Sequence, residues 1–191
     1  DVEGAVELAK TANETSPVTV FVRAHGIPLG DENILRELSK NNPYFTYKDC
    51  TCPYVKKIHN IAKDNSSDDN VFILLGGAEH PEVVGIMSYF DGEKYTVNSA
   101  SALEELLEGE NGPKILQKLP ILAAQTTQNL SEWKKSQEIL KKLYTNQKFC
   151  AKILPLIFTL IPVNKGLDSC VDVAKIVCLI IFLISPALIS T

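Results

Sequence analysis

The clearest structural signal in this chain is the segment Val71-Phe72-Ile73-Leu74-Leu75-Gly76-Gly77-Ala78-Glu79-His80-Pro81-Glu82-Val83-Val84-Gly85. Its first five residues are apolar and mostly branched or aromatic, which predicts a strand buried on both faces. The two glycines that follow predict a turn, and the proline predicts the first turn of a helix. A buried strand that leads through a short loop into a helix is the repeating unit of parallel α/β sheets.

The same alternation extends in both directions over residues 1–148. Further strands are expected at 18–23, 44–48, 95–97 and 121–124, and helices at 31–40, at 53–63, from 81, and up to 143. Ser101, with Glu104 three residues later, has the spacing of a capping box and predicts another helix start. We therefore expect the α/β class, with a three-layer α/β/α domain built on a mainly parallel sheet.

The character of the chain changes near residue 149. The chain has 19 Lys and Arg and 23 Asp and Glu, but residues 149–191 contain only five of them, namely Lys152, Lys165, Asp168, Asp172 and Lys175. The apolar run 176–184 is shorter than the roughly 17–25 residues of a membrane-spanning helix. We expect an irregular apolar tail that does not associate with membranes, and the alternative is divergence into a membrane-associated tail.

Overall charge argues against a nucleic-acid-binding protein. The formal net charge is −4 at pH 7, with a pI of about 5.4. A nucleic-acid-binding domain usually carries a basic patch and a high pI. A nucleic-acid partner is therefore not expected.

Chemically active side chains occur where predicted strands end. In a parallel sheet these ends share one edge, and ligands bind beside it. His25 and His80 follow two such strands, and the neighbouring glycines would let backbone N–H groups approach the same anion, such as a phosphate. Alternatively, each is an ordinary solvated or capping histidine. The other candidates at this edge are Cys52, Glu82, Gln125, Thr126 and Thr127.

Cys52 precedes Pro53 at a predicted helix start, where the positive end of the helix dipole favours a thiolate. Such a thiol suits iron–sulfur ligation or nucleophilic work, and the alternative is a buried structural cysteine. Glu82 is either a proton donor or a charge that favours its helix start. Thr126 and Thr127 either cap the next helix or bind a substrate hydroxyl. His59 is expected on the surface of the helix that starts at 53.

Four ordered blocks carry a resemblance to a known family: Val22–Gly26, Asp49–His59, Gly77–Gly85 and Ala124–Thr127. They resemble 4-hydroxy-3-methylbut-2-enyl diphosphate reductase, the last enzyme of the non-mevalonate isoprenoid pathway. The resemblance implies a cytosolic (cytoplasmic) enzyme with a 4Fe-4S cluster on three cysteines, at the centre of three similar α/β domains. It also implies reductive removal of a hydroxyl, which yields isopentenyl and dimethylallyl diphosphate, and an electron-donor protein such as ferredoxin or flavodoxin.

The resemblance also implies roles for individual residues. Cys52 matches the second cluster ligand, and His25 and His80 match histidines that hold the diphosphate of the substrate. Glu82 matches the acid that protonates the departing hydroxyl. Thr126 and Thr127, next to Gln125, match the threonines that order this hydroxyl and the proton network.

Residues 1–148 would be the middle domain of the family's three, and several family motifs are absent from the sequence. There is no Gly-Phe-Cys-x-Gly-Val motif, no Thr-x-Cys motif and no Gly-Gly-x-x-Ser-Ser-Asn-Thr loop, and Cys50 stands where the family usually has alanine. The cluster ligand set is therefore incomplete, and we expect an inactive fragment. One hypothesis is that 149–191 is a frame-shifted third domain, which sequencing the encoding DNA would test. The alternatives are a phosphate-binding α/β module without redox activity and a membrane-associated remnant.

Overall fold

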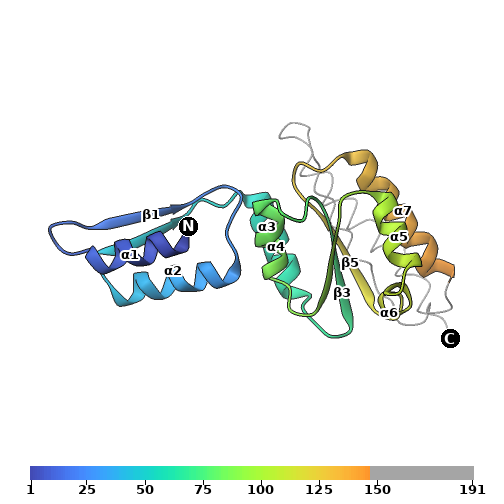
Figure 1. Ribbon diagram of the computed structural model, residues 1–191, viewed down its shortest axis with the longest axis horizontal. Coiled ribbons are helices and arrows are strands. Elements are labelled where there is room, and N and C mark those ends of the chain that lie inside the picture. Colours follow the sequence, from blue (N-terminus) through green and yellow to red (C-terminus); the bar gives the residue numbers. More distant parts are fainter. Residues whose placement is uncertain (147–191) are drawn as a thin grey trace, which may run out of the picture. The chain divides into compact units, whose positions relative to one another are not determined.

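The computed structural model describes residues 1–146, in which helices and strands alternate along the chain (Figure 1). The strands are β1 (Val18–Val22), β2 (Phe45–Asp49), β3 (Asn70–Leu75), β4 (Glu93–Val97) and β5 (Leu119–Ala124). The helices are α1 (Val2–Thr11), α2 (Leu29–Asn41), α3 (Pro53–Asp64), α4 (Pro81–Ser88), α5 (Ala100–Glu108), α6 (Gly112–Ile115) and α7 (Leu130–Asn146).

Strands β1 and β2 form a parallel pair with helices on one face. The register runs from Val18 opposite Phe45 to Val22 opposite Asp49. Figure 1 shows α1 and α2 on the same side of β1. Side chains alternate between the faces of a strand, so Val22 is buried beneath the helices while Phe21 is 68% exposed.

The second sheet has the order β4-β3-β5, and all its strands are parallel. The central strand β3 is buried from Val71 to Leu75, as expected for a strand with a neighbour on each edge and helices on both faces. Figure 1 shows α3 and α4 on one side of this sheet and α5 and α7 on the other. This part of the chain is the expected three-layer α/β/α arrangement.

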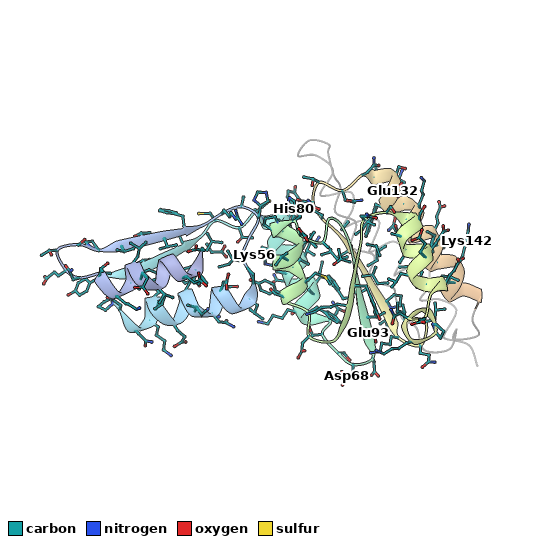
Figure 2. All side chains as sticks on the ribbon, viewed as in Figure 1. Lys56, Asp68, His80, Glu93, Glu132 and Lys142 are labelled. Atoms are coloured by element: carbon teal, nitrogen blue, oxygen red, sulfur yellow. The ribbon has the colours of Figure 1, made fainter. Side chains whose placement is uncertain are left out.

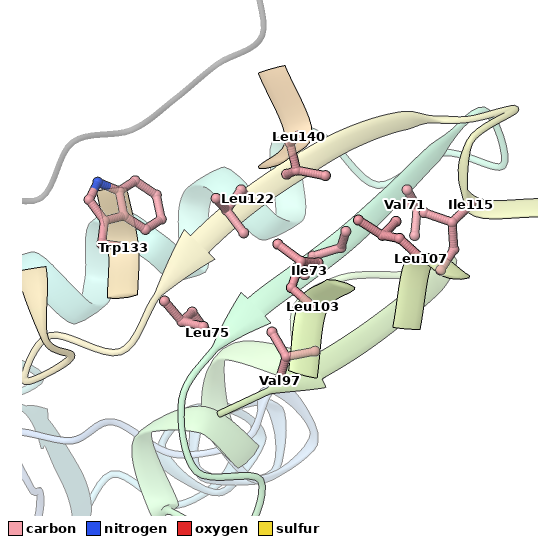
Figure 3. Close-up of a cluster of buried hydrophobic side chains, with 10 residues drawn as sticks. All are labelled: Val71, Ile73, Leu75, Val97, Leu103, Leu107, Ile115, Leu122, Trp133 and Leu140. Carbon is pink, nitrogen blue, oxygen red and sulfur yellow. The ribbon is translucent and has the colours of Figure 1, made fainter. Parts of the chain in front are cut away.

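Alternate residues of β3 supply the two cores of this sheet. One set, Val71, Ile73 and Leu75, points toward α5 and α7. These three side chains belong to a cluster of ten buried hydrophobic residues that also includes Leu103 and Trp133 (Figure 3). Phe72 points to the opposite face and stacks on Phe90, which follows α4, with ring centroids 5.2 Å apart. The strand therefore anchors helices on both sides, including the helix α4 that begins with the candidate residues.

The α/β class and the parallel pairing are confirmed, but the strands form two sheets where one was expected. The helix that follows β2 lies at the break between the two sheets. α3 buries its apolar stripe and packs against α4. The strand that follows α3 pairs with β4 and β5 and does not extend the β1-β2 pair.

The capping-box prediction at Ser101 is wrong. The N-cap of α5 is Ser99, whose hydroxyl accepts a hydrogen bond from the N–H of Ala102 at 3.1 Å. Two serines separated by one residue offer nearly the same local signal, and the chain uses the earlier one.

The apolar tail expected at 149–191, with its proposed frame shift, lies outside the described residues. Within residues 1–146, no helix combines the length and the apolar character needed to cross a membrane.

Candidate functional site

The two candidate histidines lie next to each other. His25 follows β1, in a turn closed by a hydrogen bond from the N–H of Gly26 to the carbonyl of Arg23 at 3.0 Å. Gly26 has a φ of +75°, which glycine adopts without strain. His80 follows β3 at the start of α4 (Figure 2). The two imidazole rings meet edge to face, with centroids 5.5 Å apart.

His80 is oriented by its own helix. Its Nδ1 accepts a hydrogen bond from the N–H of Glu82 at 3.2 Å, so the ring caps α4. A nitrogen that accepts cannot carry the proton in the neutral ring, so Nε2 bears it and is the donor left for a ligand. The ring therefore presents an N–H beside the positive end of the α4 dipole, and both features favour an anion.

Glu82 is buried and held by the loop after β5. Its side chain is in the first turn of α4, and the residue is only 2% exposed. One carboxyl oxygen accepts from the backbone N–H of Thr126 at 2.7 Å, and the other accepts from the hydroxyl of Thr126 at 2.9 Å. Two hydrogen bonds to one residue fix the carboxyl group in a single orientation and satisfy both its oxygens.

The strand register brings Glu82 and Thr126 together. Leu75 of β3 lies opposite Ala124 of β5 at the last position of their ladder, so the two following loops start side by side. Gln125 connects these loops. Its amide oxygen accepts from the N–H of Gly77 at 3.4 Å, and its amide nitrogen donates to the hydroxyl of Thr127 at 3.0 Å.

Cys52 contacts the segment before His25 through its backbone. It is the N-cap residue of α3, its side chain is half-buried, and its N–H donates to the carbonyl of Ala24 at 2.9 Å. The residue before His25 is therefore tied to Cys52. No cluster of three or more His, Cys, Asp or Glu side chains that could hold a metal ion occurs in the described part of the chain.

All seven candidate residues follow the carboxyl ends of β1, β2, β3 and β5, as the sequence predicted, but these strands belong to two sheets and not to one. A continuous path of contacts runs from His25 to His80, from His80 to Glu82, and from Glu82 to Thr126. Their chemical roles stay predictions. Chemically, the arrangement offers imidazole donors for an anion at one end of the path and a fixed carboxyl group at the other.

The prediction that His59 lies on the helix surface is wrong. His59 is 4% exposed and stacks on Tyr89, with ring centroids 4.0 Å apart. Burial lowers the pKa of His59 from 6.5 to about 4. The signal that could have revealed this was its spacing. The buried residues of α3 are Val55, Ile58, His59 and Ala62, which is the i, i+3, i+4, i+7 pattern of a core-facing stripe.

The fold and the site together define an α/β protein whose strand-end loops bring two imidazoles together beside a buried carboxyl group. The family model described as "LytB protein" matches residues 2–154. The chain belongs to the LytB family.

Curated relatives and a solved structure agree with this family. The chain is 35% identical to a 4-hydroxy-3-methylbut-2-enyl diphosphate reductase of Campylobacter hominis, over 69% of this chain and 44% of that protein. It is 31% identical to the enzyme of the same name from Clostridioides difficile, over 74% of this chain and 50% of that protein. A solved structure of (E)-4-hydroxy-3-methyl-but-2-enyl diphosphate reductase matches with a TM-score of 0.50 and 28% identity, over 65% of this chain and 41% of that chain. The chain therefore spans about half the length of the curated relatives it matches.

Proposed function

We propose that this chain is part of a 4-hydroxy-3-methylbut-2-enyl diphosphate reductase, and that it carries the diphosphate-binding imidazoles and the proton-donating group of that enzyme. The observation that supports this most strongly is the path of contacts from His25 through His80 and Glu82 to Thr126. A diphosphate at the imidazoles would place the other end of a short substrate within reach of the carboxyl group. The proposed reaction takes up two electrons and two protons, breaks a C–O bond and releases water.

In this proposal the protein residues bind, orient and supply a proton. His25 and His80 hold the diphosphate, with His80 donating from Nε2. Glu82 supplies a proton toward the departing hydroxyl. Thr126, whose hydroxyl donates to Glu82 at 2.9 Å, orients the carboxyl group toward the departing hydroxyl that receives the proton. Gln125 and Thr127 keep the loop after β5 in the geometry that the transfer requires.

A complete iron–sulfur cluster does not fit the described residues. Cubane clusters are held by several cysteine thiolates, and an open iron still leaves three to be bound by protein. Cys52 is half-buried at the start of α3 and could bind one iron, but Cys50 is the one other cysteine in residues 1–146. We therefore derive no step through the cluster. The remaining ligands, and the docking of an electron donor such as ferredoxin or flavodoxin, would come from the portion of the relatives that this chain does not match.

Binding of inorganic pyrophosphate to the full chain tests the anion site. Calorimetric titration is expected to show binding, and His25→Asn and His80→Asn are each expected to weaken it about tenfold, because each removes an imidazole donor near the anion. Asparagine at position 80 keeps a capping oxygen for α4, so the helix start is retained.

The matched control is Lys142→Gln, which removes an exposed positive charge on α7 far from His80 (Figure 2). It is expected to leave the affinity unchanged. An equal loss in this variant would mean that pyrophosphate senses overall charge and no specific site.

A second candidate function is a phosphate-binding module without redox chemistry. It is favoured by the pairing of anion-binding imidazoles with a single thiol suited to cluster ligation. Anaerobic reconstitution with iron and sulfide is expected to give far fewer than four iron atoms per chain, because the ligand set is incomplete. A stoichiometric cluster in the absorption spectrum, lost in Cys52→Ser, would instead favour a self-sufficient reductase.

A further inference from the structure

A pair of buried rings that the proposed chemistry does not use lies beneath the His25 turn. His59 of α3 stacks on Tyr89, the residue after α4, with an interplanar angle of 15°. The residues are 4% and 9% exposed. The Nε2 atom of His59 is buried and has no hydrogen-bond partner within the described part of the chain. A polar ring atom is rarely buried without a hydrogen bond, so the packing of the ring must offset the free-energy cost of this unpaired nitrogen.

The His59 ring touches the turn that carries His25. A Cβ atom added to Gly26 would lie 2.7 Å from Cε1 of His59 and 3.3 Å from its Nε2. The backbone of Gly26 therefore rests directly on the ring, and only a residue without a side chain fits there. Gly26 follows His25 immediately, so the position of the His59 ring determines where the turn that carries His25 lies.

Tyr89 fixes the other side of the same turn. Its hydroxyl donates to Oε2 of Glu32 at 2.6 Å and lies 3.4 Å from the carbonyl oxygen of Ile27. Oε1 of Glu32 in turn accepts from Arg36 at 2.6 Å. Burial, and then the neighbouring Glu32 carboxylate, raise the pKa of Tyr89, so its hydroxyl stays a donor over the working pH range.

A second tether connects α4 to the same segment. The N–H of Leu29 donates to the hydroxyl oxygen of Ser88 at 2.8 Å, and that hydroxyl donates to the carbonyl of Gly85 at 2.6 Å. The eight residues of α4 span about 12 Å. Helix α4 thus begins after His80, and Ser88 at its other end is hydrogen-bonded to the segment that follows His25.

We propose that His59 and Tyr89 are positioning residues that hold the 25–27 turn against α4 and thereby set the His25 imidazole opposite that of His80. This rests on the proposed function only in assigning the imidazole pair to diphosphate binding. Neither residue touches the anion. Their effect passes through the backbone of Gly26 and Ile27.

Tyr89→Phe in the full chain tests the proposal, because it keeps the ring stack and removes the hydroxyl. Two readouts are needed: pyrophosphate affinity by calorimetry, and the NMR cross-peak (NOE) between ring protons of His25 and His80. The chain has three histidines, so His25→Asn and His80→Asn spectra assign the ring signals. We expect about fivefold weaker pyrophosphate binding and a weakened or absent cross-peak between the two rings.

The matched control is Tyr95→Phe. Tyr95 of β4 also donates its hydroxyl to a carboxylate, Glu93, at 2.6 Å. Glu93 begins β4 at the end of the second sheet opposite His80 (Figure 2). The control removes the same kind of hydrogen bond, so a merely structural loss would appear in both variants. We expect unchanged affinity and an unchanged ring-to-ring cross-peak in Tyr95→Phe.

The outcomes separate the two proposals. If the unmodified chain does not bind pyrophosphate but Tyr89→Phe alone loses the cross-peak, the proposed function fails and the positioning role stands. If Tyr89→Phe retains both affinity and cross-peak, or if Tyr95→Phe loses as much, the positioning role is overturned. Should Tyr89→Phe fail to fold, Glu32→Gln leaves the ring stack intact, weakens the same hydrogen bond, and is judged by the same two readouts.

Discussion

Phe72→Ala is expected to lower the free energy of unfolding by about 4 kcal/mol, because it removes a fully buried aromatic ring and leaves a cavity. Phe72 is 0% exposed in the central strand β3, and its ring stacks on Phe90. Urea unfolding followed by circular dichroism would measure the loss as a lower midpoint at an unchanged slope. Because Phe90 follows α4, the cavity also loosens the helix that carries His80 and Glu82.

The matched control is Phe21→Ala. Phe21 lies in β1, another parallel strand, but is 68% exposed. The same truncation there is expected to cost less than about 0.5 kcal/mol, as for most surface substitutions. Similar losses in the two variants would contradict the burial pattern and, with it, the assignment of β3 as the centre of the second sheet.

Strands with a strong local signal were predictable from sequence, whereas strand pairing was not. The apolar run from Val71 to Leu75 predicted β3, which spans Asn70–Leu75. α1 was not predicted because its buried residues are the small Ala5 and Ala9, whose apolar signal is weak. The division into two sheets depends on which strands pair, and pairing between segments distant in the sequence is not encoded by any local pattern.

The site was predictable to the extent that parallel strands share an edge. The rule applies to β3 and β5, which share a sheet. His25 and His80 follow strands of two different sheets, so the rule predicted their proximity without giving its actual cause. The pairing of Glu82 with Thr126 depends on the register between β3 and β5, which the sequence does not indicate. The role of Tyr89 could not be predicted either, because its partners Glu32 and Ile27 are more than fifty residues away along the chain.

Lowering the pH from about 7 to about 4 is expected to reduce the free energy of unfolding by about 2 to 3 kcal/mol through His59. Burial lowers the pKa of His59 in the folded state to about 4, while an unfolded chain would protonate the ring near its usual 6.5. Between these values the unfolded chain binds the additional proton. The free energy of unfolding is therefore unaffected by the protonation of His59 above about pH 6.5, decreases as the pH falls below that value, and stops decreasing through His59 below about pH 4.

The charged groups around His59 shape this effect without reversing it. Burial is the largest cause and lowers the pKa of His59; Glu32 and Asp49 raise it, and Lys56 lowers it. Asp49 adds a separate loss at lower pH. Burial raises its pKa, but hydrogen bonds from Lys56 and Thr51 outweigh this and hold it at about 2, against a usual 3.8.

Glu93 behaves like Asp49. Burial raises its pKa, but hydrogen bonds from Tyr95 and from two lysines lower it to about 2, against a usual 4.5. Both carboxylates therefore withdraw their stabilisation only as the pH falls below those usual values. The interval from about 6.5 to about 5 is where the titration of His59 can be observed apart from theirs.

Urea unfolding of the full chain at about pH 7, 6 and 5 would measure this slope, with His59→Gln as the comparison. Glutamine cannot take up a proton, so the variant should lose little stability over this interval, although the lost ring stack lowers its stability at every pH. The slope therefore separates ionisation from packing. Parallel profiles for the two proteins would mean that His59 is protonated as easily in the folded state as in the unfolded state. This would contradict the burial of its ring against Tyr89 with an unpartnered nitrogen, because burial disfavours the charged ring.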